Sequence, residues 1–129
     1  MDARERRARG EATYREVLGH DPPPALDPYT SQGVLDTVFS ELWTRPGLTR
    51  KERRLITLAC VGAASSPVAI EGHLRGALDS GDLTLEEVQE FVLHFAFYAG
   101  WPRAAAFEAA LVAYQAQRQQ PGRAGADQP

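Results

Sequence analysis

The stretch HLRGALDSGDLTLEEVQEFVLHFAFYAG, residues 73–100, decides the fold. Gly81 ends the helix that begins before His73, and Thr84 with a glutamate three residues later has the form of a capping box that opens a second helix. His94 lies beside the apolar face of that second helix, with Tyr98 one turn further on. The face recurs at three- and four-residue spacing, as Val88, Phe91, Val92, Phe95, Ala96 and Ala99. The stretch therefore predicts a helical hairpin with one buried face.

Helical signals continue on the N-terminal side of this hairpin. Residues 2–18 are typical of a polar, solvated helix, and the prolines at residues 22–24 interrupt any regular structure after it. Asp27, followed by a proline, favours the start of a new helix that runs through Trp43. The N-terminal part therefore consists of a helix, a proline-rich arm and a second helix.

A central apolar helix follows. Thr49 with Glu52 forms another capping box, and residues 55–64 are apolar around most of the helix circumference. Such a helix belongs in the centre of a structure. About six helices leave few partners to cover it within one chain, so we expect neighbouring subunits to do so in a trimer or a ring of trimers. The proline-rich arm would then lie along an adjacent subunit.

Two further helices complete the pattern. Pro67 opens a helix in which Glu71 and Arg75 are spaced to pair across one turn, and Pro102 opens the last helix. Sustained alternation of apolar and polar residues is absent from the sequence, so strands are not predicted. We predict an all-α fold, a compact bundle of about six helices.

Composition limits the class of protein. A chain of 129 residues with 43% hydrophobic content corresponds to one domain. We divide it into an N-terminal helix and arm at 1–26, a helical domain at 27–118 and a disordered tail at 119–129. The formal charge of −3, with arginines interleaved among acids, does not indicate a nucleic-acid partner. Neither a transmembrane span nor a signal peptide is predicted, so we expect a cytoplasmic protein without a membrane partner.

Cys60 is the single cysteine. One cysteine excludes an intrachain disulfide, a Cys-x-x-Cys redox pair and a thiolate-rich metal site. Because Cys60 stands within the apolar central helix, we expect it to be a small buried hydrophobe rather than a reactive thiol.

Three segments carry a resemblance to a known family. WTRPGLTRKERRLITLA, HLRGAL and EEVQEFVLHFAFYAGWPRAA resemble the carboxymuconolactone decarboxylase family in the same order and at nearly the same spacing. The resemblance covers about residues 10–117. It implies an all-helical fold that assembles into trimeric or hexameric rings, and it implies either decarboxylase chemistry, thiol-dependent alkylhydroperoxidase chemistry or a reaction not yet assigned.

The peroxidase branch of that family is excluded by three positions. Its chemistry uses Cys-x-x-Cys just before the histidine of the HL segment and a glutamate further upstream, and these places hold Ser66, Ala69 and Arg54. Without a peroxidatic thiolate and a resolving thiol, the chain lacks the nucleophile that reduces a peroxide.

The decarboxylase branch fits better. Arg45 falls in its W-x-R-P-G-L element, Arg53 in its next arginine position and His73 in H-L-R-G-A-L. The resemblance implies a cofactor-independent decarboxylase that acts on a small unsaturated carboxylate or lactone, without a metal. A guanidinium can hold a carboxylate through two hydrogen bonds, fixed cations stabilise the charge left when carbon dioxide departs, and imidazole suits proton transfer near neutrality. We therefore predict His73 and Arg53 as catalytic residues and Arg45 as a substrate-binding residue.

Three more residues are candidates for the wall of the substrate pocket. His94 stands where the family also tolerates glutamine, which favours a polar lining role, and Tyr98 follows one turn later. Trp101 replaces a small aliphatic residue of the decarboxylases and could reshape or fill the pocket. Each candidate also has a structural interpretation: His73 could be a core histidine, and Arg53 could bridge helices.

Two classes of function stay open at this level. The first is the enzyme. The second is a reused scaffold, either an isomerase or cyclase in a biosynthetic pathway or a non-catalytic oligomeric protein that binds a small ligand. A cavity bounded by His73, Arg53 and His94 would favour the enzyme, whereas Trp101 filling that cavity would favour the binding protein.

Overall fold

The protein is all-α, as predicted. A computed structural model describes residues 1–24 and 27–119, the side chains of residues 30–32 excepted, and this part of the chain contains no strand. Its elements follow the order α1 (Ala3–Leu18), α2 (Pro28–Ser31), the π-helical η1 (Gln32–Leu42), α3 (Arg50–Ala63), α4 (Pro67–Asp79), α5 (Leu85–Ala99) and α6 (Trp101–Arg118). None of the described helices combines the length and apolarity needed to cross a membrane. The predicted disordered tail lies, from residue 120 onward, outside the described residues.

The helix starts follow the predicted capping signals. At α3 the Thr49 hydroxyl accepts the backbone N–H of Glu52, whose carboxylate accepts the N–H of Thr49, and Thr84 with Glu87 repeats the arrangement at α5. Asp2 caps α1 in the same way. Because each box satisfies two backbone donors that the helix itself leaves free, these sequence signals fix the helix boundaries locally.

The helix predicted from Asp27 is wider than an α-helix over most of its length. The Asp27 carboxylate caps its first turn by accepting the N–H of Tyr29 at 2.7 Å. Further on the hydrogen bonds span five residues, so that the N–H of Trp43 donates to the carbonyl of Val38 at 3.0 Å. The wider helix, η1, packs more closely on α1 than on any other element.

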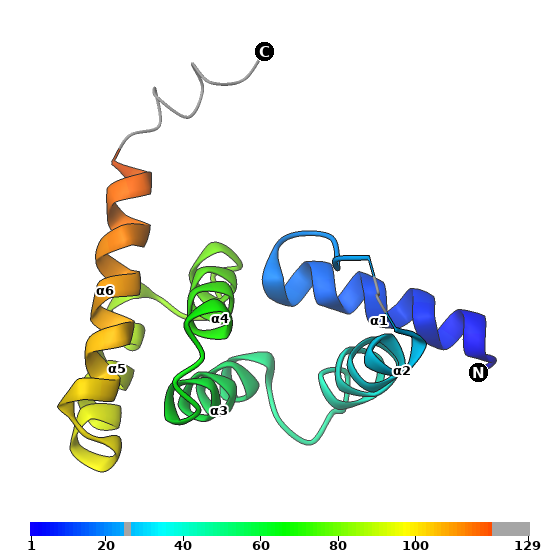
Figure 1. The fold of residues 1–129 in the computed structure, drawn as a ribbon, viewed down its shortest axis with the longest axis horizontal. Helices are drawn as coiled ribbons and strands as arrows, with labels where there is room; N and C mark the ends of the chain where they lie inside the picture. Colours follow the sequence, from blue (N-terminus) through cyan, green and yellow to red (C-terminus); the bar gives the residue numbers. More distant parts are fainter. Residues whose placement is uncertain (25–26, 120–129) are drawn as a thin grey trace.

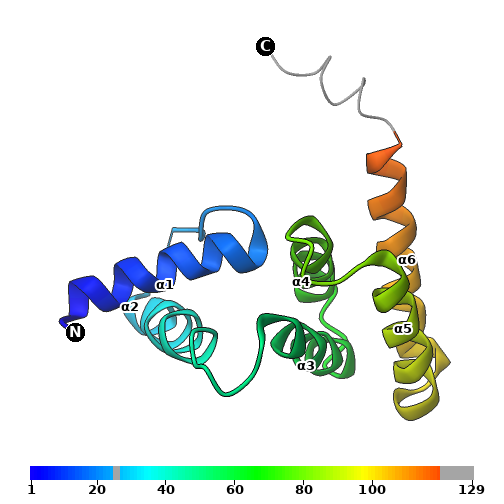
Figure 2. The ribbon, with the colours of Figure 1, turned by 180° about the vertical axis from the view of Figure 1, so that it is seen from behind.

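The helices bury two separate cores. In Figures 1 and 2, α1 and η1 lie on one side, the α5 and α6 hairpin lies on the other, and α3 and α4 stand between them. The smaller core joins α1 to η1 through Val17, Leu35, Phe39 and Trp43. The larger core is formed by α3 to α6. The predicted apolar face of α5 is part of it: Val88, Val92, Phe95 and Ala96 are buried, with Phe91 and Ala99 partly buried against them.

The prediction of a buried Cys60 was wrong for the chain as the structure shows it, because Cys60 is exposed. The buried positions of α3 are Arg54, Leu58 and Gly62, which recur every four residues along one face. Cys60 lies two residues after Leu58 and therefore points to the opposite side of the helix, where Ile56 is also exposed. The chain itself therefore leaves part of the apolar surface of residues 55–64 exposed.

Candidate active site

A hollow of about 520 Å³ opens between the α1 and η1 pair and α4. Its walls come from α1, the segment that follows α1, η1 and the first half of α4. They are predominantly apolar, and the residues that define them for the chemistry are Tyr14, His20, Phe39, Val68, His73 and Arg75. We call this space the His73 hollow.

His73 is only partly accessible in this hollow. Its Nδ1 atom is buried and has no hydrogen-bond partner among the described residues. Burial, together with the positive charge of Arg54, lowers the pKa of His73 from the ordinary 6.5 to about 4. The imidazole is therefore neutral near pH 7.

The His73 ring packs in parallel on the Trp43 indole. The two ring centroids lie 6.3 Å apart with an angle of 6° between the planes. The guanidinium carbon of Arg54 lies 5.7 Å from the centroid of the same indole, within reach of a cation–π contact. Arg54, Trp43 and His73 thus form a continuous series of contacts from the interior to the hollow.

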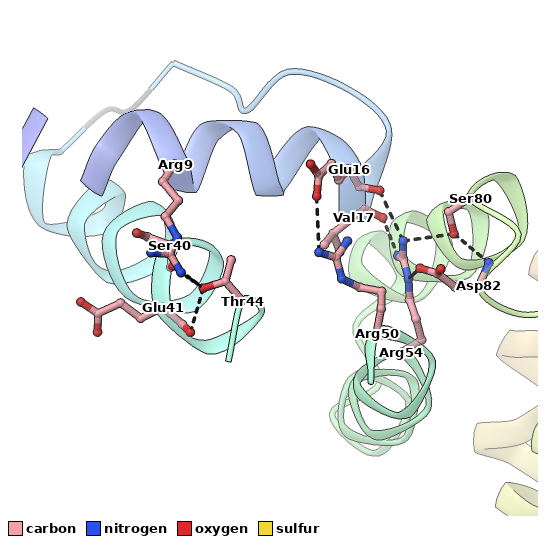
Figure 3. Close-up of polar contacts among 10 residues, drawn as sticks. All are labelled: Arg9, Glu16, Val17, Ser40, Glu41, Thr44, Arg50, Arg54, Ser80 and Asp82. Atoms are coloured by element: carbon pink, nitrogen blue, oxygen red, sulfur yellow. Dashed lines mark hydrogen bonds and ion pairs between the residues drawn. The ribbon is translucent and has the colours of Figure 1, made fainter. Parts of the chain in front are cut away.

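Arg54 is itself almost completely buried, with a relative exposure of 1%. Its Nη1 donates to the carbonyl of Val17 at 2.5 Å, and its Nη2 to the carbonyl of Glu16 at 3.4 Å and to the Ser80 hydroxyl at 3.3 Å. Its Nε donates to the Asp82 carboxylate at 3.1 Å (Figure 3). The two carbonyls belong to the last turn of α1, where a helix leaves its acceptors unpaired. Arg54 therefore joins α3 to the end of α1 and to the segment between α4 and α5.

Sequence reasoning did not identify Arg54 or Trp43 as neighbours of His73. One signal for Arg54 was available, since it lies on the face that Leu58 and Gly62 bury, and a charge on such a face requires partners. Nothing comparable in the sequence pairs Trp43 with His73, because the contact joins two helices that are distant along the chain.

The predicted arginines lie outside the His73 hollow. Arg53 donates from Nη2 to the backbone carbonyl of Arg45 at 3.1 Å, and so holds the turn between η1 and α3. Arg45 is exposed and lines a different hollow of about 340 Å³ beside η1. Within one chain, the structure does not bring Arg53 or Arg45 to His73.

His94 and Tyr98 line another hollow, of about 600 Å³, between α3 and α5. Their rings are parallel, with centroids 5.1 Å apart. Trp101 is exposed, packs edge-on against Phe97 at 5.3 Å and lines a fourth hollow between α5 and α6. In the described part of a single chain, the four hollows therefore keep His73, His94, Arg45 and Trp101 apart, and Trp101 does not fill the His73 hollow.

The His73 hollow also contains the positions that the peroxidase branch uses for its cysteines. Ser66 and Ala69 both line it, whereas Cys60 does not. Arg75 is the arginine that shares the hollow, and its Nη1 donates to the Glu71 carboxylate at 2.7 Å, as the sequence spacing predicted. The hollow therefore offers an imidazole and a guanidinium, and no thiol among its described lining residues.

Comparisons with known proteins identify the family to which the sequence is similar. The model of the carboxymuconolactone decarboxylase family matches residues 28–113, which include Trp43, Arg54 and His73. A nitrosuccinic acid decarboxylase of Metarhizium robertsii is 37% identical over 78 residues, which cover 58% of this chain and 54% of the relative. A 4-carboxymuconolactone decarboxylase of Acinetobacter baylyi is 39% identical over 64 residues, which cover 50% of this chain and 47% of the relative. The chain thus spans about half the length of the curated relatives it matches.

Proposed function

Because the chain belongs to the carboxymuconolactone decarboxylase family, we propose that it decarboxylates a small carboxylic acid in the His73 hollow. One observation supports this most strongly: a partly buried, neutral imidazole, with one nitrogen that has no partner among the described residues, lines a predominantly apolar hollow. The names of the two relatives indicate the class of acid. In both named acids, a carbonyl or nitro group can take up the charge that remains after carbon dioxide leaves.

The reaction requires one proton for each acid. Loss of carbon dioxide leaves an electron pair on carbon, delocalised onto an acceptor oxygen, and that carbon must then be protonated. A carboxylate bound beside His73 favours the protonated ring by charge attraction, so the arriving substrate raises the pKa of the imidazole. The imidazolium then gives its proton to carbon, becomes neutral again and is reprotonated from water.

A cation is needed to hold the carboxylate. Arg75 meets this need within one chain because it lines the His73 hollow, although it also pairs with Glu71. A substrate carboxylate can take one edge of the guanidinium while Glu71 keeps the other. Arg53 and Arg45 would contribute only where a neighbouring subunit brings them to the hollow.

The test compares histidine variants on 4-carboxymuconolactone and on nitrosuccinic acid. His73→Ala should reduce kcat about 10²-fold or more, the usual consequence of removing a proton-transfer residue. His94→Gln is the matched control, because it changes a histidine of another hollow, and it should cost much less. Each variant must first show the wild-type helical content and mass. A fully active His73→Ala beside an inactive His94→Gln would move the site to the hollow between α3 and α5.

The arginines are tested in the same assay. Arg75→Lys should raise KM about tenfold or more, because an ammonium cannot reproduce a bidentate guanidinium contact. Arg53→Lys should leave KM near the wild-type value. A rise in KM for Arg53→Lys alone would show that the carboxylate binds to the Arg53 and Arg45 pair, and would reject the role of Arg75.

A further inference from the structure

Arg54 contacts the Trp43 indole, and the Trp43 indole packs on the His73 ring. We infer that Arg54 is a positioning residue for His73: it fixes the Trp43 indole on which the His73 ring packs, and it holds a permanent positive charge near that ring. This inference rests on the proposed role of His73. It assigns a task to a side chain that does not itself line the His73 hollow.

Arg54 cannot move without disturbing α1 and the segment between α4 and α5. Its hydrogen bonds reach α1, the Ser80 hydroxyl and the Asp82 carboxylate. Gly76 of α4 adds a steric limit, because a Cβ at that position would lie 2.0 Å from the Val17 carbonyl oxygen and 3.0 Å from Nη1 of Arg54. The guanidinium is therefore confined to one place, and a buried charge is screened little by salt.

Trp43, which Arg54 contacts, restricts the orientation of the His73 ring. The indole is 5% exposed and packs in parallel on Phe39, with ring centroids 6.4 Å apart, as well as on His73. A flat side chain held in this way leaves the imidazole one favoured plane. The direction in which the ring nitrogens meet a substrate is then set by Trp43. The indole is held in turn by Arg54, by Phe39 and by Arg50, whose guanidinium carbon lies 5.9 Å from the indole centroid.

The charge of Arg54 acts on the protonation of His73. The other titratable groups of the hollow are Tyr14, His20, Asp21, Glu71 and Arg75. Asp21 pairs with Arg15 and Glu71 pairs with Arg75, whereas Arg54 is the group whose charge, after burial, lowers the pKa of His73. Asp82 compensates part of that charge through its contact with Arg54. The free protein thus keeps His73 neutral until an anion binds.

A measurement without substrate tests the effect of the Arg54 charge on the protonation of His73. The ring signals of His73 are followed by NMR against pH in the full chain, assigned by their loss in His73→Gln. Arg54→Met should raise the pKa of His73 by about half a unit or more because the nearby cation is gone. Asp82→Asn should have the opposite effect, because Arg54 then lacks its compensating carboxylate and the ring stays neutral to a lower pH.

The two variants separate a charge effect from loosened packing. Loosened packing would hydrate the ring and raise the pKa of His73 in both, so shifts in the same direction, or no shift in either, would overturn the inference. If Arg54→Met does not fold, Asp82→Asn alone decides the test. A lower pKa of His73 in that variant supports the inference, and an unchanged or higher pKa of His73 rejects it. Because this titration uses no substrate, it stays informative even if the decarboxylase proposal fails.

The positioning role of Trp43 is tested by a pair of variants. Trp43→Leu should lower kcat about tenfold with little change in KM, because the ring that transfers the proton loses its fixed plane while the carboxylate contact remains. Trp43→Phe, which can still stack, should restore most of kcat. An equal kcat for Trp43→Leu and Trp43→Phe would show that Trp43 only fills space.

Discussion

At the scale of single residues, a histidine kept neutral by burial makes the folded protein sensitive to acid. Folding lowers the pKa of His73 from 6.5 to about 4. Between these values the unfolded chain binds a proton that the folded chain does not, so the contribution of His73 to stability is complete above the ordinary pKa and is lost as the pH falls toward 4. The loss should approach about 1.4 kcal/mol per pH unit in that window.

The corresponding prediction concerns His73→Gln. The free energy of unfolding, measured with urea at a series of pH values across this window, should fall less steeply in His73→Gln than in the wild type. The same measurement on His20→Gln is the control, because His20 is exposed whereas His73 is partly buried. Equal slopes for wild type and His73→Gln would contradict the assignment of a neutral, buried imidazole.

Cys60 gives a second prediction at this scale. The thiol is exposed on α3, outside the His73 hollow, and the proposed reaction does not use a thiolate. Cys60→Ser should therefore leave kcat near the wild-type value, and the wild type should not reduce peroxides with added thiols. Loss of turnover in a folded Cys60→Ser, or measurable peroxide reduction, would place the protein in the peroxidase branch.

Sequence reasoning reached His73 but not its surroundings. His73 stands out in the sequence because it belongs to the short segment HLRGAL, which resembles the family. Trp43 and Arg54 come close to His73 only when the helices pack. Periodicity shows which side of a helix is buried, but it does not show which residue of another helix lies opposite. For the same reason the sequence grouped His73, Arg53 and His94, which the single folded chain keeps apart.

At the scale of secondary-structure elements, the attachment of α1 decides whether the His73 hollow exists. Arg7 of α1 binds Asp36 of η1 through two hydrogen bonds of 2.5 and 2.8 Å, which lowers the pKa of the Asp36 carboxyl. Arg54 holds the other end of α1. Because α1 and η1 form two of the walls, loosening either attachment should open the hollow to water.

Gly76→Ala tests this attachment. The new Cβ would lie 2.0 Å from a backbone oxygen of α1, which cannot rotate away as a flexible side chain could. We expect a loss of about 2 kcal/mol in the free energy of unfolding, in the range of overpacked sites. Gly33→Ala is the matched control in a helix, because no described atom outside its own helix backbone and chain neighbours lies within 4 Å of its Cβ position, and it should be neutral or stabilising. Equal effects of the two changes would contradict the close contact at Gly76.

Helix boundaries could be predicted from the sequence more fully than helix type. Thr49, Thr84 and the turn glycines act locally, so their signals survive without tertiary information. The π-helical η1 packs closely on α1, where a Cβ on Gly10 would lie 1.9 Å from the Leu35 carbonyl oxygen. Sequence spacing carries no signal for that contact.

At the scale of the whole molecule, the single chain leaves several large apolar side chains exposed to solvent. Large apolar side chains are exposed on α3, α5 and α6, namely Ile56, Leu93, Phe97, Tyr98, Trp101 and Val112. A patch of this extent is typical of a surface that another protein covers. Together with the apolar residues 55–64, it supports our proposal that the chain assembles with copies of itself.

Light scattering tests the assembly. We expect a mass three or six times the 14.1 kDa of one chain at micromolar concentration. Phe97→Asp should lower that mass, since it places a charge in the apolar patch, while Gln117→Asp on the exposed end of α6 serves as the control. A wild-type protein that remains a monomer at this concentration would refute the proposal of self-association.

The most direct test of the central claim is the yield of carbon dioxide. Purified wild type, without any added cofactor, should release one carbon dioxide for each molecule of 4-carboxymuconolactone or nitrosuccinic acid that it consumes, and His73→Ala should release it about 10²-fold more slowly or slower still. Consumption of the acid without carbon dioxide would identify an isomerase or cyclase on the same scaffold. Binding without any turnover of these acids or of related unsaturated lactone acids would contradict the decarboxylase assignment altogether.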